Sequence, residues 1–457
     1  MALFSKVLVA NRGEIAVRVF RTLRELGIAT VAVYSEADRT AVHVRRADEA
    51  YLIGPGPAAQ SYLVWERIIE TALRAGAQAI HPGYGFLAEN ARFATAVEEA
   101  GLTWIGPPPS AIDAMGSKTA ARDLMKKAGV PIVPGTTEPV TSADEVARLG
   151  DEMGWPIAIK AASGGGGKGL KVVRAREDVE SAFASAQREG QAYFADPTVY
   201  VEKFIEDPRH VEVQVLADSH GTVIHLGERD CSIQRRHQKL IEESPSQALT
   251  SETREAMEAS VERACRQLGY VNAGTFEFLL GPDGTPSFIE VNCRLQVEHP
   301  VTEMTTGIDI VREQLRIAAG ERLPMTGRAP RSGHAIEVRI NAEDPRRDFA
   351  PTPGIITRFR PPLGPGVRVD TAVIEGAAIP PFYDSMIAKV IVHDDNRDAA
   401  IARAIRALEE LEVEGIPTTR DLAIDILRSR EFRGGDYSTS YLAEMEGRLP
   451  SMSAELA

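Results

Sequence analysis

One stretch of this sequence restricts the fold more than any other, because its polar and apolar residues alternate without a break. Residues 288–300 read F-I-E-V-N-C-R-L-Q-V-E-H-P, with a polar side chain at every second position from 290 to 298. Successive side chains of an extended strand point to opposite faces. We therefore expect a strand with five polar groups on one face: Glu290, Asn292, Arg294, Gln296 and Glu298.

The polar residue types favour a binding or catalytic site over a solvated strand face. Solvated faces are typically rich in Lys, Thr and Ser, whereas this row sets two carboxylates around an amide and a guanidinium. A carboxylate can bind a metal ion or accept a proton, and an arginine fork can bind an oxyanion. The row alone indicates a site without naming a reaction.

A predicted hairpin brings a further carboxylate to this row. The segments 276–280 and 286–292 flank the turn G-P-D-G-T, which is typical of a tight hairpin. In that register Glu277 faces Glu290, and like charges in such a pair repel unless a cation lies between them. Mg²⁺ suits this position because it binds carboxylate oxygens together with phosphate oxygens and water. The alternative is a carboxylate pair exposed to solvent.

Charge and cysteine content exclude several classes of function. The 457 residues carry a net charge of -13, which argues against a general nucleic-acid or anionic-membrane surface. No run approaches the ~18 apolar residues of a membrane helix, and the N-terminal apolar run is too short for a signal peptide, so we expect a cytoplasmic location.

Cys231, Cys265 and Cys293 have no metal or redox spacing and are expected to be reduced core residues.

The chain divides into three predicted domains of mixed α/β and α+β class. Residues 1–115 alternate short apolar runs with amphipathic segments, which indicates an open parallel α/β sheet. Residues 116–205 contain a linker helix and a strand–glycine loop–strand hairpin, which we interpret as a lid. In residues 206–457 the candidate strands are mostly antiparallel.

The glycine loop S-G-G-G-G-K-G at 163–169 is predicted to close over phosphates. It is neither a dinucleotide fingerprint nor a Walker A loop, because a strand follows it and Gly169 replaces the hydroxyl residue. Its backbone N–H groups are free of β-carbons and can approach phosphate oxygens. Lys160 and Lys168 add positive charge for a nucleotide. A flexible hairpin without a ligand is the alternative.

A basic segment stands out in this acidic chain. Residues 228–239 read E-R-D-C-S-I-Q-R-R-H-Q-K and contain Arg229, Arg235, Arg236, His237 and Lys239. A solvated basic loop is the alternative, but beside carboxylates and a nucleotide such a segment is better interpreted as an anion site.

Six motifs, in order, resemble biotin carboxylase of the ATP-grasp superfamily. They are V-A-N-R-G-E-I-A at 9–16, H-P-G-Y-G-F-L-A-E-N at 81–90, the glycine loop, the basic segment, the alternating row extended to 304, and H-A-I-E-V-R-I-N-A-E-D-P at 334–345. The resemblance covers Lys6 to about Leu442. It implies an ATP-grasp fold and a two-step reaction: bicarbonate and MgATP (or MnATP) give carboxyphosphate and ADP, and N1 of biotin on a carrier protein is then carboxylated.

The resemblance also implies which residues bind ATP and metal. The positions that match family contacts to ATP are Lys118, Lys160, Gly165, Gly166, Gly167, Lys168, Glu202, Lys203, Ile205, His210, Gln234, His237, Gln238, Glu277 and Glu290. Within this set, Glu202 and Lys203 match the adenine hinge, and His237 and Gln238 match ribose contacts. The positions that match metal ligands are Glu277 and Glu290, with Asn292 beside them.

For the second substrate, Arg294, Gln296 and the Val297 backbone match a bicarbonate cradle. Glu298 matches the general base, Lys239 matches a family lysine near the γ-phosphate and bicarbonate, and Tyr84 is matched to the substrate side. Arg339 matches the residue that stabilises the biotin enolate. An arginine suits this role because it cannot lose its own proton to a base in the site.

Partners are expected in trans, because the sequence has no A-M-K-M carrier motif and no room for a carboxyltransferase domain. The resemblance implies a biotin carboxyl carrier protein, carboxyltransferase subunits and a homodimer. Acetyl-CoA for fatty acid biosynthesis, propionyl-CoA, another acyl-CoA and pyruvate remain open as acceptors in the partner reaction. The alternative functions are another ATP-grasp ligase and a nucleotide-binding protein without catalysis, and the intact set Glu298, Arg294, Lys239 and Arg339 argues against the latter.

Overall fold

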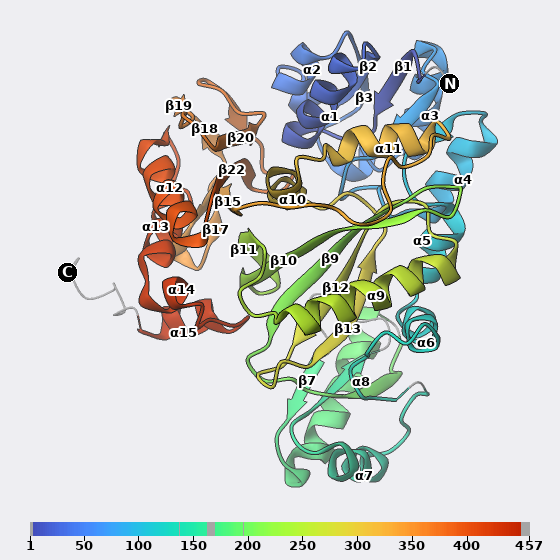
Figure 1. Ribbon diagram of the computed structural model, residues 1–457, viewed down its shortest axis with the longest axis vertical. Coiled ribbons are helices and arrows are strands. Elements are labelled where there is room, and N and C mark those ends of the chain that lie inside the picture. The colour runs from blue at the N-terminus through green and yellow to red at the C-terminus, as the bar shows by residue number, and fades with distance from the viewer. Residues whose placement is uncertain (1–2, 137, 162–169, 195, 449–457) are drawn as a thin grey trace.

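The computed structural model describes residues 3–136, 138–161, 170–194 and 196–448. Figure 1 shows a long sheet through the middle of the molecule, with the N-terminal unit above it, a small unit below it and the C-terminal helices to one side. Within these described ranges, no helix is both long enough and apolar enough to cross a bilayer.

The N-terminal unit is the open parallel sheet that the sequence predicts. Its strands lie in the order β3-β2-β1-β4-β5, and each neighbouring pair is parallel. The strands are β1 (Lys6–Val9), β2 (Ala29–Ser35), β3 (Glu49–Gly54), β4 (Ala79–His81) and β5 (Thr103–Trp104). The helical segments are α1 (Gly13–Glu25), η1 (Glu36–Asp38), α2 (Val42–Arg46), η2 (Ala58–Gln60), α3 (Trp65–Ala75) and α4 (Ala91–Glu99).

Two helices lead from this sheet to a small antiparallel unit, which we call the lid (residues 138–161, 170–194 and 196–205). The helices are α5 (Pro109–Gly116) and α6 (Lys118–Lys127). The lid sheet has the order β7-β6-β8, and its apolar side chains form a cluster of their own. The elements of the lid are α7 (Ala143–Met153), β6 (Ile157–Ala161), β7 (Leu170–Val173), η3 (Arg176–Asp178), α8 (Val179–Phe194) and β8 (Val199–Lys203).

The long sheet is antiparallel along its main path, in the order β13-β12-β9-β10-β11-β15-β22-β20, with β14 paired to β10. Its interior strand β9 is buried throughout, and helix α9 (Figure 1) covers the valine face of this strand. Since side chains alternate, the polar residues of β9 point to the opposite face. The strands are β9 (Arg209–Ala217), β10 (Val223–Arg235), β11 (Gln238–Ser244), β12 (Asn272–Leu280), β13 (Pro286–Asn292), β14 (Gly327–Arg328), β15 (His334–Asn341), β20 (Val367–Thr371) and β22 (Met386–Asp394).

Helices and short hairpins complete the C-terminal part. The helical segments are α9 (Ser251–Leu268), α10 (His299–Thr306), α11 (Ile310–Ala318), η4 (Pro345–Arg347), α12 (Arg397–Glu410), α13 (Arg420–Arg428), α14 (Arg430–Gly434) and α15 (Tyr441–Arg448). The short strands are β16 (Glu343–Asp344), β17 (Ala350–Pro351), β18 (Gly354–Ile355), β19 (Arg358–Arg360), β21 (Ala378–Ile379) and β23 (Glu412–Glu414). Helix α12 packs on β15 and β22, which buries one face of that half of the sheet.

The predicted strand over residues 288–300 is wrong in its second half. β13 ends at Asn292, residues 293–298 form an irregular segment, and α10 begins at His299. The sheet ladder stops because the chain leaves the edge of β12, whose pairing with β13 begins at Thr275 and Asn292. From that point the chain bends and turns, and it is held by side-chain contacts rather than by a neighbouring strand.

Candidate active site

A cavity of about 1190 Å³ lies where the N-terminal loops, the lid and the long sheet meet. That volume exceeds the usual size for one drug-sized ligand, so more than one substrate fits. Every predicted site residue with a described side chain lines it: Tyr84, Lys160, Glu202, Lys203, Ile205, His210, Gln234, His237, Gln238, Lys239, Glu277, Glu290, Asn292, Arg294, Gln296, Val297, Glu298 and Arg339. The side chain of Lys118 and residues Gly165, Gly166, Gly167 and Lys168 lie outside the described part of the chain.

Lys239 connects the carboxylates of this cavity. Its ammonium donates to Glu212 Oε2 (2.6 Å), Glu277 Oε1 (3.1 Å) and Glu298 Oε1 (2.5 Å). Burial opposes the positive charge, but the three carboxylates more than offset it, so the pKa of Lys239 is raised well above its ordinary value. Lys239 therefore stays charged. From β11 it contacts side chains of β9, β12 and the start of α10.

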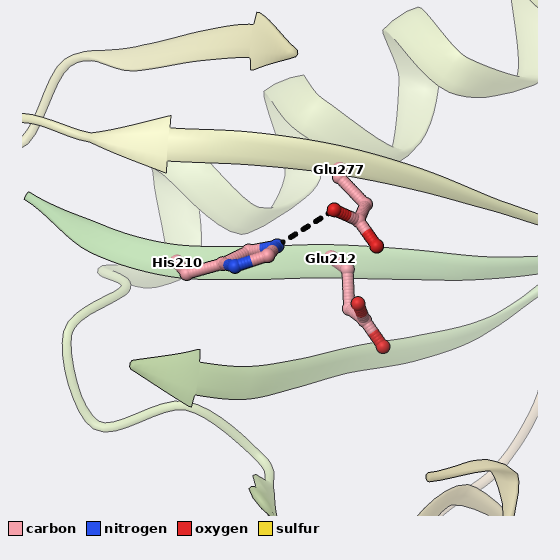
Figure 2. A group of neighbouring side chains, drawn as sticks. All are labelled: His210, Glu212 and Glu277. Carbon is pink, nitrogen blue, oxygen red and sulfur yellow. Dashed lines mark ion pairs between the residues drawn. The ribbon is translucent and has the colours of Figure 1, made fainter. Parts of the chain in front are cut away.

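Figure 2 shows how three of the polar groups approach one another. His210 and Glu212 project from β9, Glu277 projects from β12 beside it, and His210 Nε2 lies 2.9 Å from Glu277 Oε2. These residue types are found in metal sites. Here, however, Glu212 already pairs with two cations, Arg229 and Lys239, so we assign no metal ion to this trio.

The predicted register of the hairpin is confirmed, since Glu277 pairs with Glu290 across β12 and β13. Glu277 is buried, whereas Glu290 lies at the exposed side of the cavity. Asn292 Nδ2 donates to Glu277 Oε1 at 2.8 Å, which fixes the orientation of that carboxylate. Two carboxylates and an amide on one hairpin are oxygen donors of the kind Mg²⁺ prefers, so the residues present fit this ion.

Glu298 is held in its ionised form. It is buried at the start of α10, between Lys239 and Arg339, whose Nη2 lies 2.9 Å from Glu298 Oε2. Burial raises its pKa, but these two cations outweigh burial, and the pKa of Glu298 falls well below its ordinary value. An ionised carboxylate facing a substrate cavity can accept a proton.

The orientation of the Arg339 side chain is fixed by a second glutamate, Glu242. Its Nε donates to Glu242 Oε1 at 2.6 Å, and burial raises the pKa of Glu242 to about 7 despite the guanidinium. The arginine therefore reaches the cavity from β15 with its orientation set by two glutamates.

The irregular segment 293–298 is organised by Arg294. Its guanidinium donates to Asn292 Oδ1, Gln296 Oε1 and Glu89 Oε2, each at 2.7 Å. Glu89 also accepts from the Cys293 backbone N–H at 2.9 Å. The fork thus turns the segment so that its polar side chains, which a longer strand was predicted to align, still meet in the cavity.

The sequence suggested that the basic segment 228–239 forms one anion site, but the structure separates its basic side chains. Arg229 is fully buried and donates to Glu212 Oε1 (2.5 Å), because a guanidinium on the central strand β10 requires a carboxylate partner. Arg235 and Arg236 both pair with Asp348. The segment forms β10, β11 and a tight turn, in which Arg236 and His237 adopt positive φ angles of 47° and 68°. Of the five basic residues, Arg236, His237 and Lys239 line the cavity.

On the lid, Lys160 and Glu202 face each other from β6 and β8 and form an ion pair. Arg122 of α6 pairs with the same carboxylate. Lys203 donates instead to the carbonyl oxygens of Gly154 (2.9 Å) and Trp155 (3.0 Å). The Lys160 side chain is 42% exposed, so its charge is accessible to an incoming anion.

Sequence reasoning missed several residues that shape this site, of which Glu212 contacts Lys239 most directly. A signal was present: 210–215 reads H-V-E-V-Q-V, the same alternation as the opening row. Glu89 and Glu242 carried no comparable signal, because each reaches the site only through contacts between residues far apart in the sequence.

All three predicted core cysteines are confirmed as free buried thiols. Burial raises the pKa of Cys293 to about 12, so this thiol stays protonated on the apolar side of the segment.

Comparison with known proteins adds independent findings. Three family descriptions match successive parts of the chain: biotin carboxylase, N-terminal domain (residues 3–112), carbamoyl-phosphate synthase L chain, ATP binding domain (residues 117–326), and biotin carboxylase C-terminal domain (residues 337–444). The chain is 54% identical to a pyruvate carboxylase subunit of Methanothermobacter thermautotrophicus, over 97% of this chain and 90% of the relative. It is 52% identical to biotin carboxylase 1 of Bacillus subtilis, over 96% of this chain and 98% of the relative.

A solved structure agrees with these matches. The biotin carboxylase domain dimer of Hydrogenobacter thermophilus 2-oxoglutarate carboxylase, in complex with MgADP, ADP and bicarbonate, superposes with a TM-score of 0.92 at 50% identity. The match covers 98% of this chain and 98% of that one.

Proposed function

The chain belongs to the biotin carboxylase family, and on that premise we propose which part of its cavity binds ATP and which part binds bicarbonate. The protein has an ATP-grasp fold and is an ATP-dependent enzyme that carboxylates biotin on a carrier protein with bicarbonate, releasing ADP and phosphate. The predicted identity as a biotin carboxylase is thereby confirmed.

We assign the lid side of the cavity to ATP. The accessible charge of Lys160 supports this assignment, since it can exchange its carboxylate partner for a phosphate oxygen. The residues assigned to ATP are Lys118, Lys160, Gly165, Gly166, Gly167, Lys168, Glu202, Lys203, Ile205, His210, Gln234, His237 and Gln238.

We assign Mg²⁺ to Glu277, Glu290 and Asn292, which offer oxygen donors on one hairpin. When bound there, the ion neutralises charge on the phosphates of ATP. Lys239 lies 3.1 Å from Glu277 and places a second positive charge at the same end of the cavity.

We assign the opposite side to bicarbonate and biotin. In this proposal Arg294, Gln296 and the Val297 backbone bind bicarbonate, and Glu298 takes its proton as the bicarbonate oxygen attacks the γ-phosphorus of ATP. The bond between the γ-phosphorus and the bridging oxygen breaks, so that ADP leaves and carboxyphosphate forms. Arg339 then stabilises the biotin enolate, and Tyr84 lines the same cavity. The bridge of Lys239 from Glu277 to Glu298 is the observation that carries this division, because it joins the metal side to the base.

We further propose that the chain works as three domains, residues 1–115, 116–205 and 206–457, in a cytoplasmic homodimer. The separate sheet and apolar cluster of the lid support the division, and the dimer named for the 2-oxoglutarate carboxylase domain supports the assembly. The biotin carboxyl carrier protein and carboxyltransferase are proposed to act in trans. Relatives named for pyruvate, 2-oxoglutarate and acyl-CoA carboxylases leave fatty acid biosynthesis as one of several settings.

One assay tests the reaction. ADP release is measured with free biotin or biotinylated carrier, with and without bicarbonate. We expect release that depends on both bicarbonate and biotin. ADP release that does not depend on bicarbonate but increases with another carboxylate would favour a different ATP-grasp ligase. No ADP release under any condition would favour a nucleotide-binding protein without catalysis.

A further inference from the structure

The irregular segment 293–298 carries the proposed bicarbonate ligands and base without the support of a strand ladder. Its first end is held by Glu89, which accepts from the Cys293 backbone and the Arg294 side chain. Its last end is held by a residue from a distant part of the chain: Lys389 Nζ donates to the carbonyl oxygen of Val297 at 2.8 Å.

Lys389 lies on β22 and is completely buried, which is rare for a lysine. The nearest carboxylate is Glu14, whose Oε1 is 3.3 Å from the ammonium. Glu337 and Asp370 are further acidic groups acting on it, from the two strands that flank β22, and Arg339 is its cross-strand neighbour on β15. The ammonium therefore lies among acidic side chains, and its bond to Val297 is made inside a region without bulk water.

Glu14 extends this contact to the biotin side of the cavity. The Tyr84 hydroxyl donates to Glu14 Oε1, and the Tyr84 ring lies 5.8 Å from the Lys389 ammonium. A short chain of contacts thus runs from Tyr84 through Glu14 and Lys389 to Val297. It joins the N-terminal unit, β22 and the bicarbonate segment at one buried ion pair.

We propose that Lys389 is a positioning residue for bicarbonate and for the base Glu298. This inference rests on the proposed role of residues 294–298. The peptide group is planar, so a bond to the Val297 carbonyl also fixes the N–H of Glu298 and the direction in which Glu298 enters α10. Lys389 acts through that peptide and does not itself line the cavity.

The test separates positioning from simple folding stability. Lys389→Met keeps the length of the side chain, removes the bond to Val297 and leaves Glu14 without its cation. The double variant Lys389→Met/Glu14→Gln also removes that buried charge, which avoids the large cost of an unpaired ion. Both are assayed for bicarbonate-dependent ADP release with free biotin, and their thermal unfolding is recorded.

Lys6→Met is the matched control. Lys6 also bridges a carboxylate and a carbonyl, Glu49 Oε1 (2.6 Å) and Ala75 O (2.7 Å), but it lies away from the cavity. Its loss is expected to change stability without changing the KM for bicarbonate.

For Lys389→Met we expect kcat/KM for bicarbonate to fall by about tenfold to a hundredfold, as misplacement by about 1 Å can cause. The KM for ATP should stay within about twofold of wild type, since the lid is untouched. The double variant should recover stability and keep the bicarbonate defect. If Lys389→Met does not fold, the kcat/KM of the double variant for bicarbonate tests the proposal by itself.

A normal bicarbonate response in the double variant would overturn the proposal, and so would equal losses for ATP and bicarbonate. Either result is interpretable only while the wild-type enzyme responds to bicarbonate and biotin. A wild-type enzyme without that response would instead overturn the assignment of the site to bicarbonate.

Discussion

The lid and the long sheet each present a lysine paired with glutamate to the same cavity, but they bury these charges to different degrees. On the lid, the Lys160 side chain is 42% exposed and pairs with Glu202. On the long sheet, the Lys239 side chain is 11% exposed and pairs with three carboxylates, one of which also binds the fully buried Arg229.

The difference separates a replaceable ion pair from a permanent one. An exposed pair contributes little to stability and can exchange partners when a phosphate arrives. A buried network is strongly destabilised when one member is removed, because the remaining charge is left in a region of low dielectric constant. We infer that the lid supplies adjustable contacts to ATP and that the long sheet supplies a fixed arrangement for the chemical step.

The largest effect should come from the base. Glu298→Gln removes the proton acceptor but keeps the size of the side chain, so turnover should fall by on the order of 10²- to 10⁴-fold. ATP binding, followed by isothermal titration calorimetry, should stay near the wild-type value. Unaltered turnover would show that the buried network is not where the proton is transferred.

Lys239→Met tests whether the long sheet depends on its network. The change leaves Glu212, Glu277 and Glu298 close together without their common cation, and a loss of about 3–5 kcal/mol in unfolding free energy is expected. Urea denaturation measures it. A loss no greater than that of the same substitution at Lys160 would remove the contrast between the two regions.

Acid should weaken the buried ion pairs of the long sheet in a defined range. Although burial acts against ionisation, His334 and Arg397 lower the pKa of Glu243 to about 2 from 4.5. Because the folded-state pKa is the lower one, this stabilisation is complete above pH 4.5 and is lost as the pH falls toward 2. Glu243→Gln should therefore cost on the order of 3 kcal/mol at pH 7, and less at pH 3.

The control for that change is Glu152→Gln, on the lid helix α7. Glu152 is exposed and pairs with Arg148 four residues earlier, so the expected change is within about 0.5 kcal/mol at either pH. Urea denaturation at both pH values measures the two variants. A Glu243 variant whose deficit is equal at both pH values would contradict the assignment.

The smallest effect on stability is expected at Lys160. Lys160→Met should change the unfolding free energy by less than about 1 kcal/mol, while raising the KM for ATP several-fold and leaving the KM for bicarbonate unchanged. Initial rates at varied ATP and bicarbonate measure both constants. A rise in both constants together would mean that the lid pair also shapes the bicarbonate side.

Sequence patterns predicted the elements whose neighbours are local. The alternating apolar runs of residues 1–115 predicted the open parallel sheet that contains β1 and β2, and the P-D-G turn predicted the pairing of Glu277 with Glu290. They gave no hint of β3, an edge strand whose residues are mostly half exposed and therefore lack a buried run.

Patterns failed where distant contacts determine the conformation. Alternation predicted a strand to residue 300, yet beyond Asn292 the segment is shaped by Glu89 and Lys389, which no local periodicity reveals. The cluster of basic residues likewise predicted that Arg229 belongs to an anion site. Arg229 is instead buried on β10, where it donates a hydrogen bond to Glu212. The positions of the site residues followed from the family resemblance, and their individual roles stay predictions.

The bond between Lys389 and Val297, together with the pair to Glu14, has a consequence for synthesis on the ribosome. Glu14 emerges long before Lys389, so this contact cannot form until the N-terminal unit, the lid and the strands that precede β22 have been translated. A nascent chain that already contains the lid and Glu298 still lacks the lysine that we propose sets the base in place. On that proposal the enzyme acquires its full ability to consume ATP only after β22 has been synthesised.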